Sequence, residues 1–132
     1  MDIITLAAEL TADPLARGYA GMTHQQAADS LNTKNRDYAL TNMTGDELFA
    51  NTDSVEFAAL TDAKKSQWIS FCSTDRHPFG AANVAFVQYI FGGGSTTVSN
   101  LSAARTLENH ISRAEELGLG TVSAGHVEAA RA

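Results

Sequence analysis

Apolar residues recur at spacings of three and four along much of the chain, which places them on one face of an α-helix. Between residues 61 and 73 the mostly apolar stripe turns Lys64 and Lys65 away, and its members are Ala63, Gln67, Trp68, Phe71 and Cys72. The pattern predicts a helix over this segment. Trp68 is expected to anchor the core.

Short polar signals predict where helices begin. In three places a Thr or Ser is followed three residues later by Gln or Glu, at Thr23 and Gln26, Thr44 and Glu47, and Ser112 and Glu115. At this spacing the cap hydroxyl and the returning side chain bind free backbone N–H groups of a first helical turn. Further caps are predicted at Asp2, at Ser95, and at Ser123 before a short final helix over 124–131.

Residues 78–91 are apolar almost all round, which favours a central helix buried by its neighbours. Their β-branched and aromatic side chains raise strand propensity, so a strand over 84–91 stays open. The length and the alanines favour a helix. Gly92, Gly93 and Gly94 are expected to end it. In the helix that follows Ser95, the residues at helical spacing are Val98, Leu101, Arg105, Leu107 and Ile111.

These elements predict an all-α fold, a single compact domain of about five to seven short helices over residues 1–132. The length fits one domain. Apolar residues make up 44% of the chain and charged residues 18%, a balance typical of globular proteins. The single cysteine, Cys72, excludes an internal disulfide.

The formal net charge of −6 argues against a protein that binds nucleic acid by neutralising phosphates, so no sequence-specific nucleic-acid partner is expected. The first half, residues 1–66, holds 10 of the 15 acidic residues against 5 basic ones, and we expect it to present an acidic surface. The acidic start lacks the character of a signal peptide. The longest nearly apolar run, 84–91, is too short to cross a bilayer, so no membrane partner is expected.

The triglycine segment admits two interpretations. A phosphate-binding loop of the Walker type ends in Gly-Lys-Ser/Thr after a strand, whereas Gly94 is followed by Ser95 with no lysine. A helix stop with a close turn is therefore favoured. The alternative is a docking loop formed by Gly92, Gly93, Gly94 and Ser95.

No catalytic, cofactor-binding or metal-binding residue is predicted, and an enzyme is not expected. The histidines (His24, His77, His110 and His126) lack the spacing of zinc ligands, and Cys72 falls on the apolar stripe. The carboxylate pairs Asp46-Glu47 and Glu115-Glu116 fall in first helical turns, where the helix dipole stabilises them. The aromatic residues Phe86, Tyr89 and Phe91 lack interleaved Arg or Lys and are assigned to the core.

Several strings, taken together, resemble a group of small proteins encoded by tailed bacteriophages and prophages. The strings are Asp13 to Met22, Ala27 to Asn32, Ile90 to Ser95, Ser112 to Gly118 and Gly125 to Arg131. The likeness covers most of the chain in order and is weakest over 35–53. It brings no functional residues with it.

The resemblance implies a virion structural protein, most like a neck or head-tail connector (adaptor) subunit that assembles into a homo-oligomeric ring. Its partners would be copies of itself and other virion proteins, either portal or tail-side neck proteins, and it would need no cofactor. It would be made in the cytoplasm of the host bacterium and reside in the virion. The alternative is a small phage-encoded intracellular interaction or inhibitor protein with an acidic docking face.

Overall fold

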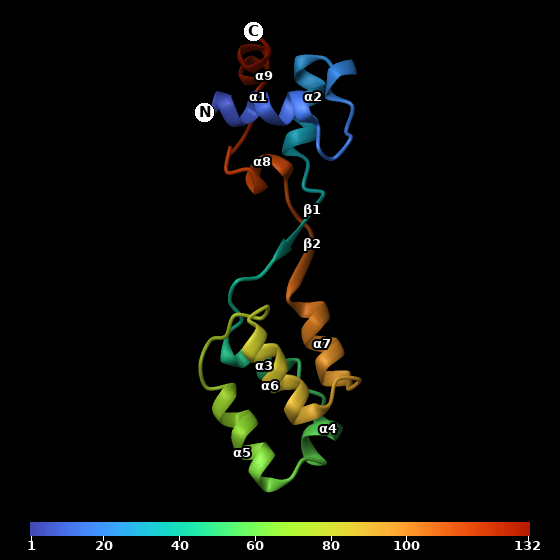
Figure 1. Ribbon diagram of the computed structural model, residues 1–132, viewed down its shortest axis with the longest axis vertical. Helices are drawn as coiled ribbons and strands as arrows, with labels where there is room; N and C mark the ends of the chain where they lie inside the picture. The colour runs from blue at the N-terminus through green and yellow to red at the C-terminus, as the bar shows by residue number, and fades with distance from the viewer. The chain divides into compact units, whose positions relative to one another are not determined.

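The computed structural model describes all 132 residues, which group into two compact units (Figure 1). Unit 1 consists of Met1–Tyr38 and Glu108–Ala132, and unit 2 consists of Ala39–Leu107. Unit 2 is thus inserted in the sequence between the two segments of unit 1, and each unit has its own hydrophobic core. The single domain expected over 1–132 stays a prediction, because a grouping of residues does not show whether the units unfold together.

Unit 1 is built around contacts between the two ends of the chain. Its helices are α1 (Ile3–Ala12), the short 3-10 helix η1 (Tyr19–Gly21), α2 (His24–Asn32), α8 (Arg113–Glu116) and α9 (Ala124–Arg131). Helix α9 packs against both α1 and α2, and α2 also contacts α8. The buried core residues are Leu6, Leu10, Tyr19, Ala27, Ala28, Leu31, Ala114, Leu119, Val122 and Val127.

Unit 2 contains the five remaining helices, α3 (Gly45–Ala50), α4 (Ser54–Ala58), α5 (Asp62–Phe71), α6 (Ala81–Phe91) and α7 (Thr96–Ala104). Its core is centred on Trp68, which is fully buried, as predicted. The Trp68 ring stacks on Phe71 with centroids 5.3 Å apart, and its Nε1 donates to Thr52 Oγ1 at 3.0 Å. Ala63 and Gln67, expected on the same stripe, are exposed, so the buried face of α5 is narrower than the pattern predicted. Lys64 and Lys65, expected to turn away from the core, are half-buried.

The six helix starts predicted from cap residues are confirmed. Each depends on hydrogen bonds within a few residues, so the local sequence can indicate it. Thr23 with Gln26 and Thr44 with Glu47 form complete capping boxes at the starts of α2 and α3. The predicted caps at four further starts also accept a backbone N–H, at Asp2, Ser95, Ser112 and Ser123. The side chain of Glu115, expected to return to the Ser112 N–H, instead accepts from the Ser112 hydroxyl at 3.4 Å. The last helix has the predicted bounds, Ala124–Arg131.

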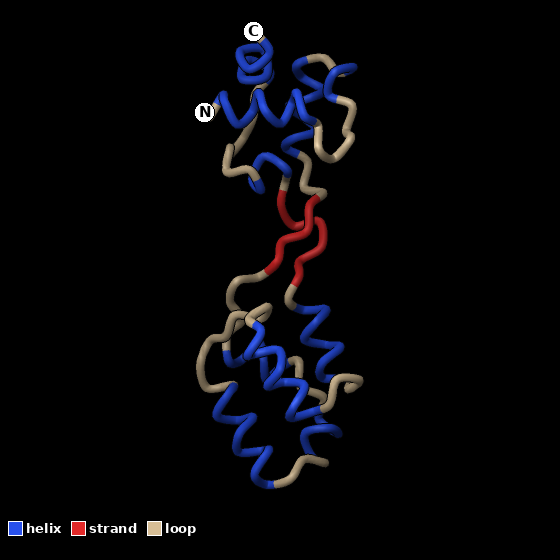
Figure 2. Tube along the Cα trace, viewed as in Figure 1, coloured by secondary structure: helices blue, strands red, loops and turns tan.

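The fold is mostly helical but not strictly all-α, and it has nine α-helices where about five to seven were expected. Strand β1 (Arg36–Ala39) pairs with β2 (Thr106–Ile111), drawn in red in Figure 2. Leu107 and Ile111 were expected to continue the helix after Ser95, but α7 ends at Ala104 and both residues lie in β2. Pairing with a segment about seventy residues earlier overrides the local helical spacing.

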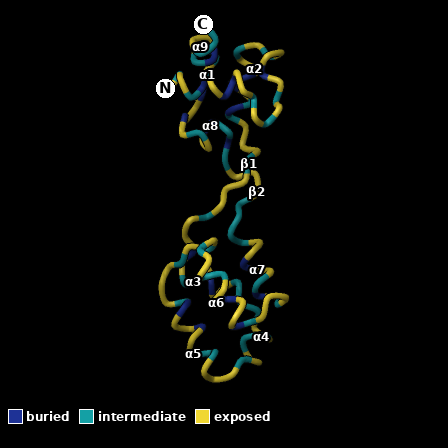
Figure 3. The backbone as a smooth tube through the Cα atoms, in the orientation of Figure 1, coloured by how far each residue is buried: buried dark blue, intermediate teal, exposed yellow.

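Helix α6 confirms helix over strand for residues 84–91, but the expected burial on all sides is wrong. Only Val87 and Ile90 are buried, and exposed positions recur along the helix (Figure 3). A unit of this size has too few neighbouring elements to enclose a helix completely. With 11 residues α6 is the longest helix, and no helix in the structure has the length and apolar character needed to span a membrane.

Candidate functional site

The triglycine segment forms a short exposed turn between α6 and α7. Gly92 adopts a φ of 88°, which ends α6, and its N–H donates to Gln88 O at 2.8 Å. Ser95 then caps α7 by accepting from the Val98 N–H at 3.2 Å. Nothing lies within 4 Å of the Cβ that Gly93 or Gly94 would carry with a side chain. The favoured interpretation as a helix stop fits this geometry, and a docking role of Gly92 to Ser95 stays a prediction.

The amino end of α7 already holds an anion from within unit 2, the carboxylate of Glu56 on α4. Glu56 Oε2 accepts from Thr96 N–H at 2.8 Å, and Oε1 accepts from Thr97 N–H at 2.7 Å and from Thr97 Oγ1 at 2.6 Å. The Thr97 hydroxyl, followed by the two backbone N–H groups, lowers the pKa of Glu56 despite the opposing effect of burial. These are the N–H groups that a phosphate at a helix start would need, so the geometry disfavours a phosphate loop.

Cys72 and the histidines form no reactive cluster. Cys72 is half-buried at the end of α5, and burial raises the pKa of its thiol to about 12, despite the opposing effect of Arg76. His77 Nδ1 accepts from the Phe79 N–H at 3.1 Å, which organises a turn. No group of three or more His, Cys, Asp or Glu side chains in the structure could hold a metal ion.

Two other histidines have structural partners that the sequence did not indicate. His126 Nδ1 accepts from the Ser123 N–H at 3.0 Å and so completes the capping box of α9, a role usually played by Glu or Gln. His24 Nδ1 lies 3.0 Å from Arg131 Nη1. The Arg131 guanidinium also donates to Tyr19 O at 2.6 Å and Met22 O at 3.1 Å, which ties the end of α9 to η1 and to the residue that follows it.

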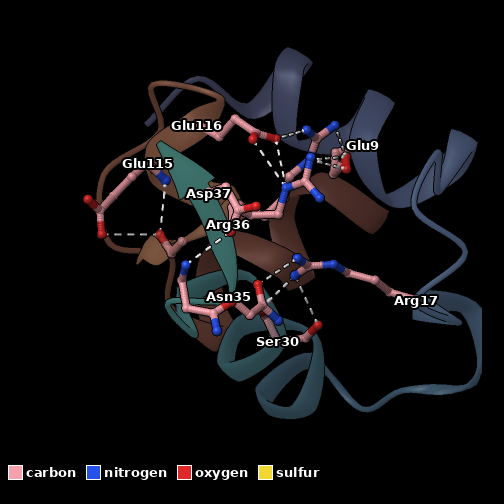
Figure 4. A network of polar contacts seen from close by, with 11 residues as sticks. Glu9, Arg17, Ser30, Asn35, Arg36, Asp37, Glu115 and Glu116 are labelled. Atoms are coloured by element: carbon pink, nitrogen blue, oxygen red, sulfur yellow. Dashed lines mark hydrogen bonds and ion pairs between the residues drawn. The ribbon is translucent and has the colours of Figure 1, made fainter. Parts of the chain in front are cut away.

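A polar network in unit 1 centres on Arg113, whose partners Glu9 and Glu116 are labelled in Figure 4. Arg113 Nε donates to Glu9 Oε1 at 2.8 Å, although Glu9 is only 4% exposed. Arg113 also pairs with Glu116, which Arg36 Nε approaches to 3.1 Å. Burial would raise the pKa of Glu116, yet the hydrogen bonds from Arg113 and Arg36 bring it below its usual value. Both carboxylates are therefore paired with arginines.

The sequence did not predict that Glu9 is buried and paired. A carboxylate near Leu6 and Leu10 in a helix gives no sign of a distant cation. Its partner Arg113 is 104 residues away in the chain, too far for any local pattern to indicate. The network of Figure 4 also includes Arg17, which donates to Ser30 O at 2.8 Å and Asn35 Oδ1 at 2.9 Å. The contacts around Arg113 therefore tie α1, β1 and α8 together, and those of Arg17 tie the loops on either side of α2 to that helix.

The aromatic residues assigned to the core separate into two environments. Phe86 stacks on Phe71 with centroids 4.7 Å apart, and Phe91 meets the edge of Trp68 at 4.8 Å, so both pack against the core. Tyr89 is 59% exposed, which corrects its assignment to the core. Its position in α6 directs the ring away from Val87 and Ile90, the residues of α6 that are buried.

Tyr89 on α6 lies beside positive charge on α5, where Lys64 and Lys65 are half-buried. Lys64 Nζ lies 5.0 Å from the centroid of the Tyr89 ring and donates to Tyr89 O at 3.3 Å. Lys65 and Ile69 are four residues apart on one face of α5, and Ile69 is 55% exposed. We call Lys64, Lys65, Ile69 and Tyr89 the basic apolar surface.

A second set of exposed residues, on α3 and α4, carries negative charge. Phe49 is 47% exposed with its ring edge against Phe57, and Val55 is 74% exposed. The exposed carboxylates Asp46 and Glu47 lie in the same first turn of α3. We call Asp46, Glu47, Phe49 and Val55 the acidic apolar surface. The acidic half expected from the sequence is divided between the two units, and unit 2 holds this part of it.

Comparisons with protein-family models, with curated proteins and with solved structures found no match for this chain.

Proposed function

We propose that this protein is a structural subunit of a tailed-phage virion, most like a head-tail connector (neck or adaptor) subunit, which acts by ring assembly and not by turnover. The likeness of the strings between Asp13 and Arg131 to small phage proteins supports the phage origin. The observation that carries the assembly is the pair of surfaces on unit 2, each with exposed apolar side chains. One is acidic and apolar, and the other is basic and apolar.

Two different and complementary surfaces on one subunit suit a head-to-tail contact between identical copies. Such a contact uses one patch from each neighbour, and a series of them closes into a ring when the rotation per subunit fits. The apolar members (Phe49, Val55, Ile69 and Tyr89) would supply the buried centre of the contact. The charges around them would set the register and exclude like-charged pairings. Isolated subunits can still be monomeric at low concentration, because assembly depends on the concentration of partners.

The proposal places the protein in the virion, after synthesis in the cytoplasm of the host bacterium. Its neighbours would be copies of itself and either portal or tail-side neck proteins. The first test is mass spectrometry of purified particles of the phage or prophage that encodes the chain. Many copies per particle are expected. Absence from particles that are intact would contradict a structural role.

A charge exchange tests the surfaces themselves. Asp46→Lys and Lys65→Glu each place a like charge in the contact, so each variant alone should lose incorporation into particles. Mixing the two variants should restore it, because each then offers its unaltered surface and the altered surfaces can pair with one another. Glu128→Lys, at an exposed position of α9 in unit 1, is the matched control and should assemble normally. Normal incorporation of both single variants would contradict the head-to-tail contact.

A small intracellular interaction or inhibitor protein is the second candidate, and one observation favours it. Residues 37–63 contain six carboxylates and no Lys, Arg or His, and they include the acidic apolar surface. Such a surface suits a basic host partner. Absence of the chain from particles, together with capture of one defined basic host protein that Asp46→Lys abolishes, would favour this function.

A further inference from the structure

Unit 2 contains a small cavity that neither the self-assembly contact nor the network of unit 1 uses. It lies between α6 and α7, which pack against each other, with α3 and residues 76–78 completing the wall. Its volume is about 110 Å³. Most of the wall is apolar and is formed by Met43, Leu48, Val84, Val87, Val98 and Leu101.

The charged part of the wall is entirely cationic. Arg76 and Arg105 both line the cavity, His77 lies beside them, and no Asp or Glu contributes to it. These are the two arginines of unit 2, in a chain whose net charge is −6. The nearest carboxylate in the sequence, Asp75, accepts from Asn42 Nδ2 at 3.3 Å and does not line the cavity. An anion in the cavity would therefore meet positive charge without a competing carboxylate.

Both guanidinium groups have free hydrogen-bond donors. Neither arginine forms a salt bridge in the structure. Arg76 Nε donates to Phe71 O at 3.2 Å, and Arg105 Nη1 reaches Pro78 O at 3.5 Å. A guanidinium carries five N–H donors, so most of them have no protein acceptor.

The arginines are also held in place by aromatic rings. The Arg76 guanidinium carbon lies 4.4 Å from the Phe71 ring centroid, and that of Arg105 lies 4.2 Å from the Phe79 ring centroid. Stacking occupies the flat face of a guanidinium and leaves its N–H edge available in the plane, the geometry that matches a carboxylate. Both guanidinium groups are thus held in place before any ligand arrives.

We propose that this cavity binds a small organic carboxylate with a short apolar tail. The carboxylate would accept from Arg76 and Arg105, and the tail would lie against Val84, Val98 and Leu101. A volume of about 110 Å³ is smaller than the roughly 150 Å³ of an apolar cavity that binds benzene, and so suits a tail of about three or four carbons. An inorganic anion would leave the apolar wall unfilled, and an amine of the same length would be repelled by the arginines.

Titration of the full chain with butyrate, followed by amide NMR shifts of Val84 and Val98, tests the proposal. Saturable shifts are expected with butyrate, much weaker ones with acetate, and none with n-butylamine. Arg105→Gln removes one charge-assisted donor and should weaken butyrate binding about tenfold. Lys65→Gln removes a cation of unit 2 that does not line the cavity and should change the affinity less than about twofold.

Val84→Phe is a second test of the cavity that keeps both arginines, for the case in which Arg105→Gln does not fold. The larger ring fills the cavity from its apolar side, so butyrate binding should disappear while the far-UV circular dichroism spectrum stays that of the parent. Equal affinity for butyrate and n-butylamine, or for butyrate and acetate, would overturn the proposal. So would butyrate binding that both Arg105→Gln and Val84→Phe leave unchanged.

Discussion

At the scale of single residues, the glycine with the strongest steric requirement is Gly45, outside the triglycine segment. A Cβ on Gly45 would lie 2.0 Å from the backbone O of Cys72, whereas one on Gly93 would meet nothing within 4 Å. The first turn of α3 thus approaches the end of α5 at backbone distance. The run from Gly92 to Gly94 is conspicuous in the sequence, whereas the single Gly45 gives no sign of its steric requirement.

Gly45→Ala should destabilise unit 2 by about 1–3 kcal/mol, because the backbone of Cys72 must shift to make room for the methyl group. Chemical denaturation followed by Trp68 fluorescence measures the change, since Trp68 is the single tryptophan and lies in the core of unit 2. Gly93→Ala is the control and should be neutral or stabilising by up to about 1 kcal/mol. Equal stability of Gly45→Ala and the parent would show that the close approach does not constrain the fold.

At the scale of elements, two side chains from different parts of the chain cap the start of α7. Ser95 supplies the local cap, which the sequence predicts. Glu56 supplies a second from α4, about forty residues earlier, and Thr97 links the two helices because its buried hydroxyl also accepts from the Asp53 N–H at 3.0 Å. This arrangement joins α4 to α7 through one carboxylate and one hydroxyl.

Glu56→Gln should lower the melting temperature of unit 2 at neutral pH, because the charged acceptor of three hydrogen bonds is lost. The folded-state pKa of Glu56 lies below its usual value. Its contribution is therefore fully present above the usual Glu range and is lost as the pH falls through the folded pKa. Melting curves of Trp68 fluorescence between pH 7 and about pH 3 should show the parent and variant converging in acid. A constant difference across this range would mean that the charge of Glu56 contributes nothing.

In unit 1 the corresponding long-range link is the pair formed by Glu9 and Arg113. Both side chains are shielded from solvent, at 2% exposure for Glu9 and 15% for Arg113. The pair between Arg36 and Glu116 is more exposed, at 36% and 26%. Removing Arg113 leaves the buried carboxylate of Glu9 without a cation. In the exposed pair, water can solvate the partner that remains.

At the scale of the whole molecule, two cores lie in one chain, and one substitution tests how they are coupled. Arg113→Met should destabilise unit 1 by about 3–5 kcal/mol. We expect far-UV circular dichroism to gain an earlier transition while the Trp68 fluorescence transition stays in place, since Trp68 reports on unit 2. Arg36→Met is the matched control and should cost less than about 1 kcal/mol. Coincident shifts of both signals would show that residues 1–132 unfold as the single domain expected from the sequence.

The candidate surfaces could be predicted only in part. The carboxylates of residues 37–63 and the pair Lys64-Lys65 are visible in the sequence, but Tyr89 was assigned to the core because its segment is apolar almost throughout. Which apolar residues stay exposed depends on how many elements pack around a helix. The same holds for the cavity, whose two arginines are 29 residues apart in the sequence and lie in segments with no common pattern.

The sequence by itself indicated where six of the nine α-helices begin and favoured a helix over 84–91, because caps and helical spacing depend on hydrogen bonds and contacts within a few residues. The tertiary structure alone decided that residues 106–111 form a strand and that the residues group into two units. It also decided that Glu56 caps a distant helix and that Glu9 is buried against Arg113. Each of these depends on residues far apart in the chain. Their contacts form, and stabilise the fold, only when the intervening segments have packed.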